Sequence, residues 1–379
     1  MAAGLLASLH SPAQQEKIDS LKTILPRLKD TARINCLLEI ARGYFSVPNK
    51  DSITHYSNRG FAEAKRLNYL RGMAVGMMHR SGMAVCFRND YSGGAQLAGE
   101  AIRLFHSSPN KQEIPLAYQI LGRAQTELGR YDEALANLHL SMKWAQVTGD
   151  DRWIATNLET MTDIYRDRGD YVKLLETQQQ LARMDRACGN TDYYSPHELW
   201  VLGLTYRLLE EYPTALRFWR KLFVEPIGPE KLVGTLGTWN MTDYADLLTL
   251  ADLTDSALYY YNTFDSARAE TKELRYFLTS KGEYFLHLKQ YNTALPYFVD
   301  ALRYHRQLND RRQTNRTLID LAKTYDALHR NDSAIAYARQ GLAIAMQTNS
   351  KPLIRDGYKI LYTVYDRLQQ KDSAYLFYR

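Results

Sequence analysis

A repeat of about 40 residues runs through the sequence and constrains its fold more than any other feature. Each short polar turn is followed by one anchor residue, which is small at most positions, and successive anchors lie 37 to 42 residues apart. The anchors are Ile53, Gly94, Ala134, Leu174, Ala215, Ala257, Ala294, Ala334 and Ala374. A second turn marker keeps the same period, at Gly149, Gly189, Asn309 and Asn349. Two independent markers on one period predict a chain built from repeated units.

Each unit has the pattern of a helical hairpin. A small residue lies twelve positions before the anchor, an aromatic or apolar residue lies nine before it, and an apolar or small residue follows four after it. The fifth unit shows this with Gly203, Tyr206, Ala215 and Trp219. Apolar residues three and four apart indicate amphipathic helices, and small residues allow two helix backbones to approach closely. We expect the aromatic residues to fill the space between neighbouring hairpins.

The turns carry their own chemistry. Four second helices begin near an Asp-Ser pair, whose side chains can accept hydrogen bonds from free N–H groups and favour the positive end of the helix dipole. These pairs are Asp51-Ser52, Asp255-Ser256, Asp332-Ser333 and Asp372-Ser373. Gly129 and Gly169 instead supply the left-handed residue that closes a first helix. The sequence therefore predicts an all-α solenoid of about nine hairpins over residues 16–379, as one continuous structural domain.

The pattern Leu-Gly-x-x-Tyr followed by Ala-x-x-x-Phe resembles the tetratricopeptide repeat, over about residues 30–379. The period departs from the 34 residues usual for that family, and Gly94 and Leu174 are weak anchors. The longer helices and the Asp-Ser-Ala turn resemble the sensor regions of Bacteroidetes histidine kinases and related regulators. The resemblance implies non-enzymatic binding of a peptide or protein, with ligand occupancy shifting the curvature of the solenoid.

The resemblance also implies that positions 2, 5, 9, 12 and 13 of each first helix face a concave groove. We refer to the residues at these positions as the predicted groove residues. They are Asn35, Arg42, His79, Phe87, Gln119, Arg123, Glu159, Asp163, Arg166, His197, Trp200, Arg207, Trp239, Thr242, Asp246, Tyr276, Glu283, Arg316 and Lys323. Exposed Trp and Arg side chains carry binding energy in many interfaces, although Trp200 could equally pack against the adjoining repeat.

Composition excludes several other classes of function. The net charge is +6, but basic and acidic residues are interleaved, which is typical of solvated helix faces rather than of a nucleic-acid surface. The sequence contains no His-Glu-x-x-His, Cys-x-x-Cys, Gly-x-Ser-x-Gly or phosphate-loop motif. We therefore expect no catalytic residue, metal or cofactor. Cys36, Cys86 and Cys188 are expected to be free thiols, and residues 225–237 to form a linker.

The two ends of the sequence lead to further expectations. Residues 1–15 resemble the remnant of a secretory signal peptide with cleavage after Ala13, although the positive n-region is missing. The alternative is a disordered tail. The last residues, 375–379, are aromatic and apolar and stop partway through a helix, where a natural solenoid has a polar cap. We expect the chain to continue, in the sensor interpretation into a coiled coil, a membrane helix and an output domain. The alternative is a natural terminus that pairs with a partner.

Three other functions remain open at this stage. The chain could be a free-standing scaffold or an intracellular quorum-peptide receptor; the receptor interpretation requires residues 1–13 to be an ordinary tail. An enzyme would need carboxylates and histidines that converge in space, such as Glu159, Asp163 and His197. The sensor interpretation places the protein outside the cytoplasm, in the periplasm, and the alternatives place it in the cytoplasm. The ligand, the output domain and a homodimer are not decided by the sequence, because fold does not fix function.

Overall fold

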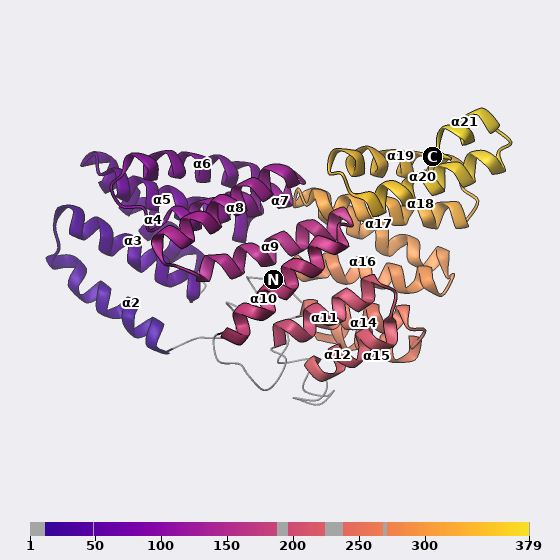
Figure 1. The fold of residues 1–379 in the computed structure, drawn as a ribbon, viewed down its shortest axis with the longest axis horizontal. Coiled ribbons are helices and arrows are strands. Elements are labelled where there is room, and N and C mark those ends of the chain that lie inside the picture. The colour runs from indigo at the N-terminus through magenta and orange to yellow at the C-terminus, as the bar shows by residue number, and fades with distance from the viewer. Residues whose placement is uncertain (1–11, 48, 188–195, 224–237, 268–270, 379) are drawn as a thin grey trace. The chain divides into compact units, whose positions relative to one another are not determined.

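The computed structural model describes residues 12–47, 49–187, 196–223, 238–267 and 271–378. Within these ranges every regular element is a helix, which confirms the all-α prediction (Figure 1). The chain divides into two compact units, Met1–Met161 and Thr162–Arg379. None of the described helices is long and apolar enough to cross a membrane.

Unit 1 is a stack of antiparallel helices that begins with α2 (Pro12–Ile24) and the short 3-10 helix η1 (Leu25–Arg27). Three complete hairpins follow, with a π-helical turn, η2 (Ala84–Arg88), at the end of α5. They are α3 (Asp30–Ser46) with α4 (Lys50–Arg66), α5 (Leu70–Met83) with α6 (Tyr91–Ser107), and α7 (Ile114–Glu127) with α8 (Tyr131–Thr148). The first part of α9 (Arg152–Arg168) completes this unit.

Unit 2 repeats the same arrangement from the last turns of α9 onward. Its hairpins place their helices side by side in chain order, as α16 to α20 show in Figure 1. The helices are α10 (Tyr171–Ala187), α11 (Pro196–Leu208), α12 (Tyr212–Phe223), α14 (Thr238–Leu250), α15 (Thr254–Ala267), α16 (Thr271–His287), α17 (Tyr291–Gln307), α18 (Arg311–Ala327), α19 (Asn331–Gln347), α20 (Lys351–Arg367) and α21 (Lys371–Leu376). The described helices therefore form the nine hairpins that the period predicts.

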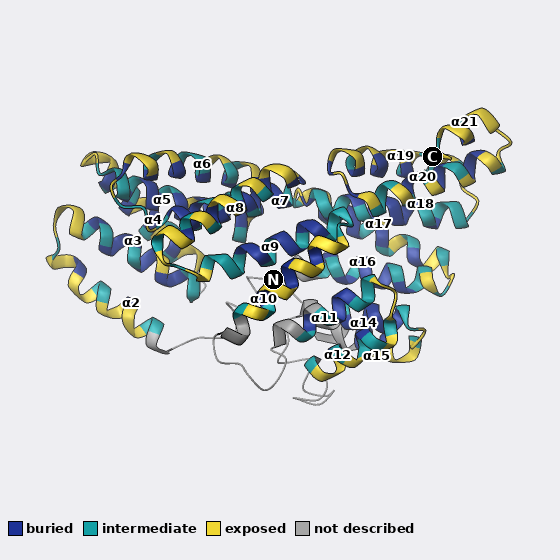
Figure 2. Cartoon of the chain, in the orientation of Figure 1, coloured by how far each residue is buried: buried dark blue, intermediate teal, exposed yellow. Residues whose placement is uncertain are grey.

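Every anchor residue occupies the same place in its hairpin. Each is the fourth residue of a second helix, from Ile53 in α4 to Ala374 in α21. All nine are buried, and seven of them are Ala or Gly. The position is small because it faces the first helix of the same hairpin where the two helices leave the turn and lie closest together. Figure 2 shows the resulting buried faces turned inward and the exposed faces turned outward along the helices.

Small residues of the first helix face large residues of the second helix sixteen positions later. A Cβ atom added to Gly122 would lie 2.8 Å from Leu138 carbons, and one added to Gly282 would lie 2.7 Å from the Phe298 ring. Gly203 faces Trp219 in the same way. Leu138, Trp219 and Phe298 are fully buried and each lies four residues after its anchor. The close approach predicted from the repeat is confirmed.

The aromatic residue nine before the anchor stacks within its own hairpin. Its partner in the second helix lies twelve residues later, and the two ring centroids are 5.4 to 5.8 Å apart. The pairs are Tyr206 with Phe218, Phe285 with Tyr297, Tyr325 with Tyr337, and Tyr365 with Phe377. The stack of Tyr325 on Tyr337 also packs against the buried cluster of the preceding hairpin. The expectation that these rings fill only the space between hairpins was therefore incomplete.

The turns follow the predicted backbone geometry but differ in their capping. Gly129, Gly149 and Gly169 adopt φ angles of 71°, 70° and 70°, and non-glycine residues take up the left-handed conformation at several other described turns, with Asn309 and Asn349 both at 50°. Gly189 lies outside the described residues. The Asp-Ser pairs were expected to cap their helices. Arg330 and Gln370 stand at the N-caps of α19 and α21 with no side-chain bond. Asp332 and Asp372 lie inside the first turn instead, where they interact with the helix dipole.

Several sequence expectations concern residues that the structure does not describe. Residues 1–11 of the expected signal remnant lie outside the described ranges, whereas residues 12–15 belong to α2. Cys188 and the expected linker, residues 225–237, also lie outside them. Cys36 is buried and Cys86 is half-buried, and both are free thiols.

The close approach at Gly122 makes a testable prediction for stability. Gly122→Ala places a methyl group against the buried Leu138, and such overpacking costs about 1–3 kcal/mol. Gly99→Ala is the matched control, because a Cβ at Gly99 in α6 meets nothing within 4 Å. We expect the control to stabilise the protein by about 0.5–1 kcal/mol, the usual advantage of Ala over Gly inside a helix. Thermal unfolding of both variants tests this; equal effects would contradict the role of Gly122.

Candidate functional site

Charged side chains gather on the first helices of the hairpins in unit 2. We call this set the charged face, and it contains six carboxylates and four cationic groups. Its members are Asp163 and Arg166 on α9, Arg207 on α11, Asp243 and Asp246 on α14, Glu283 on α16, Arg316, Asp320 and Lys323 on α18, and Asp356 on α20. Because the repeat places first helices next to one another, residues at equivalent positions on successive helices face the same side. Seven members of the charged face are predicted groove residues: Asp163, Arg166, Arg207, Asp246, Glu283, Arg316 and Lys323.

One end of the charged face is organised by arginines. Arg166 Nη2 lies 2.6 Å from Asp163 Oδ1, one turn away on the same helix. Arg207 reaches from α11 towards α14, with its guanidinium nitrogens 3.9 Å from Asp243 Oδ1 and from Asp246 Oδ2. These longer separations leave Arg207 shared between two carboxylates rather than committed to one.

Asp246 is the most embedded carboxylate at this end. It accepts hydrogen bonds from the hydroxyl of Tyr261, at 2.6 Å, and from Ser280 Oγ, at 3.0 Å. Burial and the nearby Glu283 carboxylate raise the pKa of Asp246 to about 6. Tyr261 is fully buried in the core of α14, α15 and α16, so Asp246 connects the charged face to that core.

The other end of the charged face joins α16, α18 and α20 through ion pairs. Arg316 Nη2 lies 2.7 Å from Glu283 Oε1, and Lys323 Nζ lies 2.8 Å from Asp356 Oδ2. Asp320 lies between them on α18, with Lys323 Nζ 3.7 Å from its Oδ1 atom. Its Oδ2 atom is buried and has no hydrogen-bond partner.

The side chains of the charged face are partly exposed and act on one another across helices. The side chains of Asp243 and Arg316 remain 40% and 43% exposed, yet burial raises the pKa of Asp243 above its ordinary value. Charges on three other helices also act on this carboxyl, from Arg207, Arg166 and Arg316, which lower its pKa. Asp243 is therefore accessible to solvent and lies close to charged groups of several helices.

A contact distant in sequence closes the charged face on itself. The turn between α9 and α10 meets the N-terminal ends of α18 and α20, about 145 to 180 residues further along the chain. Ser350 Oγ donates to the Asp167 carbonyl at 2.6 Å, Arg312 Nε lies 3.1 Å from Asp167 Oδ2, and Lys351 pairs with Asp170. We call this set the closing contact. It ties the first two helices of unit 2 to α18 and α20.

The predicted groove residue Tyr276 hydrogen-bonds to the residue that caps a neighbouring helix. Its hydroxyl donates to Asp310 Oδ2 at 3.4 Å, and Asp310 caps α18 by accepting from the Gln313 N–H at 3.0 Å. Arg275 Nη1 lies 3.3 Å from the same carboxylate. Beside them, burial lowers the pKa of His305 to about 4, so that this histidine is neutral at pH 7.

The predicted groove residues of unit 1 do not form a comparable charged set. Asn35 accepts hydrogen bonds from Arg71 Nη1 at 3.1 Å and Tyr69 at 3.2 Å, and Gln119 is buried. Burial, aided by the charge of Arg42, lowers the pKa of His79 to about 3, and its ring packs beside Phe45 with the ring centroids 5.7 Å apart. Arg123 Nη1 lies 3.8 Å from Cys86 Sγ. Phe87, the residue after Cys86, and Glu159 are both half-buried.

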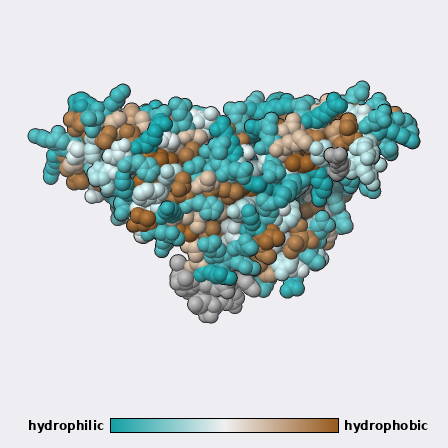
Figure 3. Space-filling model, turned by 45° about the horizontal axis from the view of Figure 1, so that its top comes forward, coloured by the Kyte–Doolittle hydropathy of each residue, from teal (hydrophilic) through white to brown (hydrophobic). Residues whose placement is uncertain are grey.

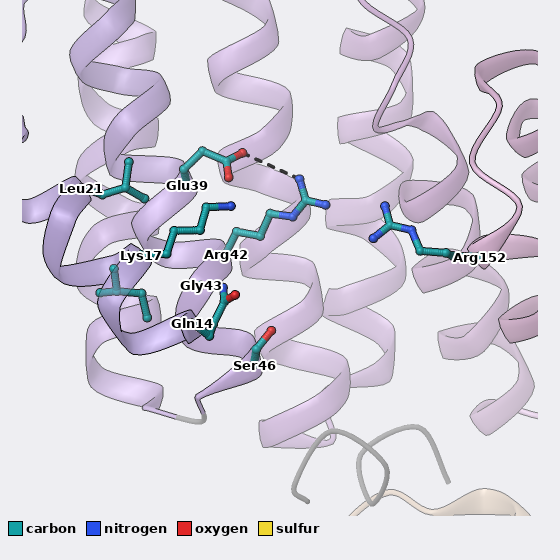
Figure 4. A pocket seen from close by; sticks show the side chains of 9 residues that line it. Gln14, Lys17, Leu21, Glu39, Arg42, Gly43, Ser46 and Arg152 are labelled. Atoms are coloured by element: carbon teal, nitrogen blue, oxygen red, sulfur yellow. Dashed lines mark ion pairs between the residues drawn. The ribbon is translucent and has the colours of Figure 1, made fainter. Parts of the chain in front are cut away.

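Arg42 lines a small cationic pocket in unit 1, shown in Figure 4. The pocket has a volume of about 310 Å³ and lies between α2, α3 and the first turn of α9. Its charged lining is Lys17, Glu39, Arg42 and Arg152. Arg42 lies 3.7 Å from Glu39 and Arg152 lies 2.8 Å from Asp150, so both guanidinium groups already have acidic partners.

Of the two tryptophans predicted to lie in the groove, only Trp200 has a described side chain. Trp200 is 7% exposed and packs in the hydrophobic core that contains Trp219 and Tyr244, which favours packing over groove exposure. Its carbonyl accepts the Trp219 Nε1–H bond at 2.9 Å. Thr242 is buried as well. The side chains of Trp239 and His197 lie outside the described residues, so the converging set of Glu159, Asp163 and His197 is not placed.

Three members of the charged face were missed by the sequence reasoning: Asp243, Asp320 and Asp356. Asp243 and Asp320 each lie fourteen residues before an anchor, a register that the groove positions omitted. Asp356 lies eighteen residues before Ala374, in the same register as Arg316 before Ala334. Extending the register to the ninth unit would have found it. Among the described residues, no group of three or more His, Cys, Asp or Glu side chains has the geometry of a metal site.

Comparison with known proteins supports this architecture. Residues 276–347, which span α16 to α19, match the tetratricopeptide repeat family. A search of curated protein sequences finds no significant match. Outside the matched segment, the resemblance to this family rests on the repeat pattern and the fold.

Several solved structures are similar to this chain at low sequence identity. A Rap conjugation gene regulator of plasmid pLS20, in complex with the Phr* peptide, is 12% identical, with 89% of this chain and 98% of that chain covered and a TM-score of 0.61. The apo form of RapI is 11% identical, with 89% and 99% covered and a TM-score of 0.52. A tetratricopeptide repeat protein from Parabacteroides merdae is 14% identical, with 76% and 98% covered and a TM-score of 0.45. Figure 3 shows one face of this chain, with hydrophilic side chains over much of it and hydrophobic ones in scattered patches.

The buried Asp320 predicts a pH-dependent stability. Burial raises its pKa to about 7, against about 3.9 in the unfolded chain. Between these values the folded protein holds a proton that the unfolded chain releases, so this group makes the protein less stable as pH rises from 4 to 7. Asp320→Asn stays neutral. We expect its advantage in stability over the wild type to be larger at pH 8 than at pH 5 by about 2 kcal/mol.

Thermal or urea unfolding at the two pH values measures this difference. Asp300→Asn on α17 is the control, because Asp300 is 48% exposed and pairs only with the exposed Arg303 among the described residues. We expect the control to change stability by less than about 0.5 kcal/mol at either pH. An Asp320→Asn variant that is less stable than the wild type at pH 8 would contradict the assignment of Asp320 as a destabilising carboxylate.

The closing contact predicts unequal effects at two glycines with the same backbone conformation. Gly149 and Gly169 both have φ of 70°, so an alanine at either position costs about 1–2 kcal/mol of backbone strain. A Cβ at Gly149 meets nothing within 4 Å, whereas a Cβ at Gly169 would lie 2.9 Å from Pro352. We expect Gly169→Ala to be the more destabilising by about 1 kcal/mol or more. Equal losses in thermal unfolding would show that the closing contact contributes little.

Proposed function

We propose that this chain is a non-enzymatic binding protein whose charged face receives a peptide or an extended segment of another protein. The observation that carries the proposal is the charged face, which six first helices build and the closing contact joins at its two ends. Arginine and carboxylate side chains of this kind can hydrogen-bond to the backbone and side chains of an extended peptide. The solved Rap structure with a bound Phr* peptide supports the proposal, because its fold is similar to that of this chain.

We further propose that the binding unit serves signal transduction, as the ligand-sensing part of a regulator such as a histidine kinase. The long repeat and the Asp-Ser-Ala turns support this interpretation. Peptide binding would tighten or loosen the helices joined by the closing contact, and nearest-neighbour packing would transmit the change along the stack. In this interpretation the chain acts outside the cytoplasm. A free-standing scaffold is the second candidate, since it needs the same binding surface without an output domain.

The binding proposal is tested by selection from a random nonapeptide display library against the 379-residue chain. Asp243→Trp is the test variant, because Asp243 is 40% exposed within the charged face and a Trp there would obstruct it without entering the core. Met346→Trp is the matched control, since Met346 is 52% exposed on the second helix α19. We expect the wild type and the control to enrich the same peptides at least tenfold, and Asp243→Trp to enrich none of them. Enrichment by all three proteins alike would contradict a site on the charged face.

A further inference from the structure

The carboxylate of Asp320 is only partly satisfied by its protein neighbours. Its side chain is 9% exposed, and its Oδ2 atom is buried without a hydrogen-bond partner. Buried carboxylate oxygens in folded proteins almost always accept hydrogen bonds, because an unmatched one loses its hydration without compensation. A retained orphan of this kind therefore needs an explanation.

The neighbouring cations cannot supply the missing donor in their present arrangement. Lys323 Nζ bonds Asp356 at 2.8 Å and lies 3.7 Å from Asp320 Oδ1, beyond hydrogen-bond distance. Arg316 is bonded to Glu283, with one guanidinium nitrogen 2.7 Å and 2.8 Å from its two carboxylate oxygens. Both cations are therefore held by carboxylates other than Asp320.

The charge balance around Asp320 is negative. Glu283, Asp320 and Asp356 face Arg316 and Lys323, which leaves three carboxylates for two cations. Arg355 also pairs with Asp356, at 3.0 Å, but its side chain is 76% exposed and points to solvent for most of its surface. On the α16 side, Asp246 adds a further carboxylate next to Glu283 and has its own cationic neighbour, because Arg207 Nη2 lies 3.9 Å from its Oδ2 atom. One more positive charge would balance Glu283, Asp320 and Asp356 against Arg316 and Lys323.

The surroundings leave a route for such a charge. Arg316 and Lys323 are 43% and 38% exposed, so their flexible side chains border the buried carboxylate on the solvent side. We also expect Asp320 to lower the stability of the protein without a ligand, since its buried Oδ2 atom has no hydrogen-bond partner. Residues that reduce stability are common where a site is built for a ligand rather than for folding.

We propose that Asp320, with Glu283 and Asp356, forms a subsite that binds the ammonium or guanidinium group of a basic side chain in the ligand. The incoming cation donates to Asp320 Oδ2 and supplies the missing positive charge. This inference rests on the proposed function for the identity of the ligand as a peptide, but the subsite itself is defined by the cluster. The selectivity follows from chemistry: a neutral side chain of the same shape can donate one hydrogen bond but leaves the charge uncompensated.

The test is a competition between two random nonapeptide amide pools mixed in equal amounts with the 379-residue chain. The pools are identical except at the central position, which is Lys or Arg in one and Nε-acetyllysine or citrulline in the other. Peptides that elute with the protein in gel filtration are counted by mass spectrometry. We expect the wild type to retain the basic pool at least tenfold more than the neutral pool.

Two variants locate the effect. Asp320→Asn keeps the shape of the side chain and, by the stability argument above, folds at least as well as the wild type, and we expect its retention ratio to fall close to one. Asp300→Asn removes a carboxylate of α17 that pairs with Arg303, and should keep the wild-type ratio. Retention of both pools by the wild type without preference, or an unchanged preference in Asp320→Asn, would overturn the subsite.

The design separates failure of the subsite from failure of the proposed function. If both pools are retained equally and Asp243→Trp abolishes retention, peptide binding stands and the cation subsite is rejected. If no peptide is retained, the proposed function fails, and 1,5-diaminopentane is then used as a free-amine probe in calorimetry. Binding of this diamine to the wild type but not to Asp320→Asn would support a cation site for free amines; no binding would overturn the subsite as well.

Discussion

The close approach of two helices behind each turn is the constraint on which the rest of the structure depends. The fourth residue of every second helix is buried against the first helix, and only a small side chain fits there in most units. Gly203 on the first helix and Trp219 on the second, sixteen residues later, lie directly opposite each other in the same hairpin. Once this geometry is fixed, the period of 40 residues places equivalent first helices next to one another, and the charged face follows from what those helices carry.

The charged face combines stabilising pairs with one group that is left unmatched. The Glu283–Arg316 pair connects α16 to α18, and the Lys323–Asp356 pair connects α18 to α20, so these ion pairs follow the repeat from hairpin to hairpin. Asp320 lies between the two pairs and gains a full hydrogen bond from neither. A stack held together by packing can tolerate this loss, because each hairpin contacts mainly its neighbours and local strain does not spread through a single core.

The repeat pattern was sufficient for predicting the fold and seven of the residues that make up the charged face. The anchor spacing gives the hairpin boundaries, since both depend on local turns and on burial every three or four residues. Arg207, Glu283 and Arg316 were found because the groove positions implied by the resemblance recur on each first helix. Trp200 shows the limit of this reasoning: a large side chain at a groove position packs into the core instead, next to Trp219. The position of a residue in the repeat predicts the direction in which its side chain points, but not how close the neighbouring helix lies to it.

The sequence alone determined the helical hairpins, their number among the described residues and the side of each first helix that carries charge. These features are local, because they depend on spacing within about 40 residues. Only the tertiary structure decided which charges are paired. The contact of Asp167 with Arg312 and Ser350 joins residues about 145 and 183 positions apart, and the curvature of the stack that brings them together is a sum of small rotations at every interface. For the same reason, the orphaned oxygen of Asp320 is visible only in the folded chain, where its potential partners are already bonded elsewhere.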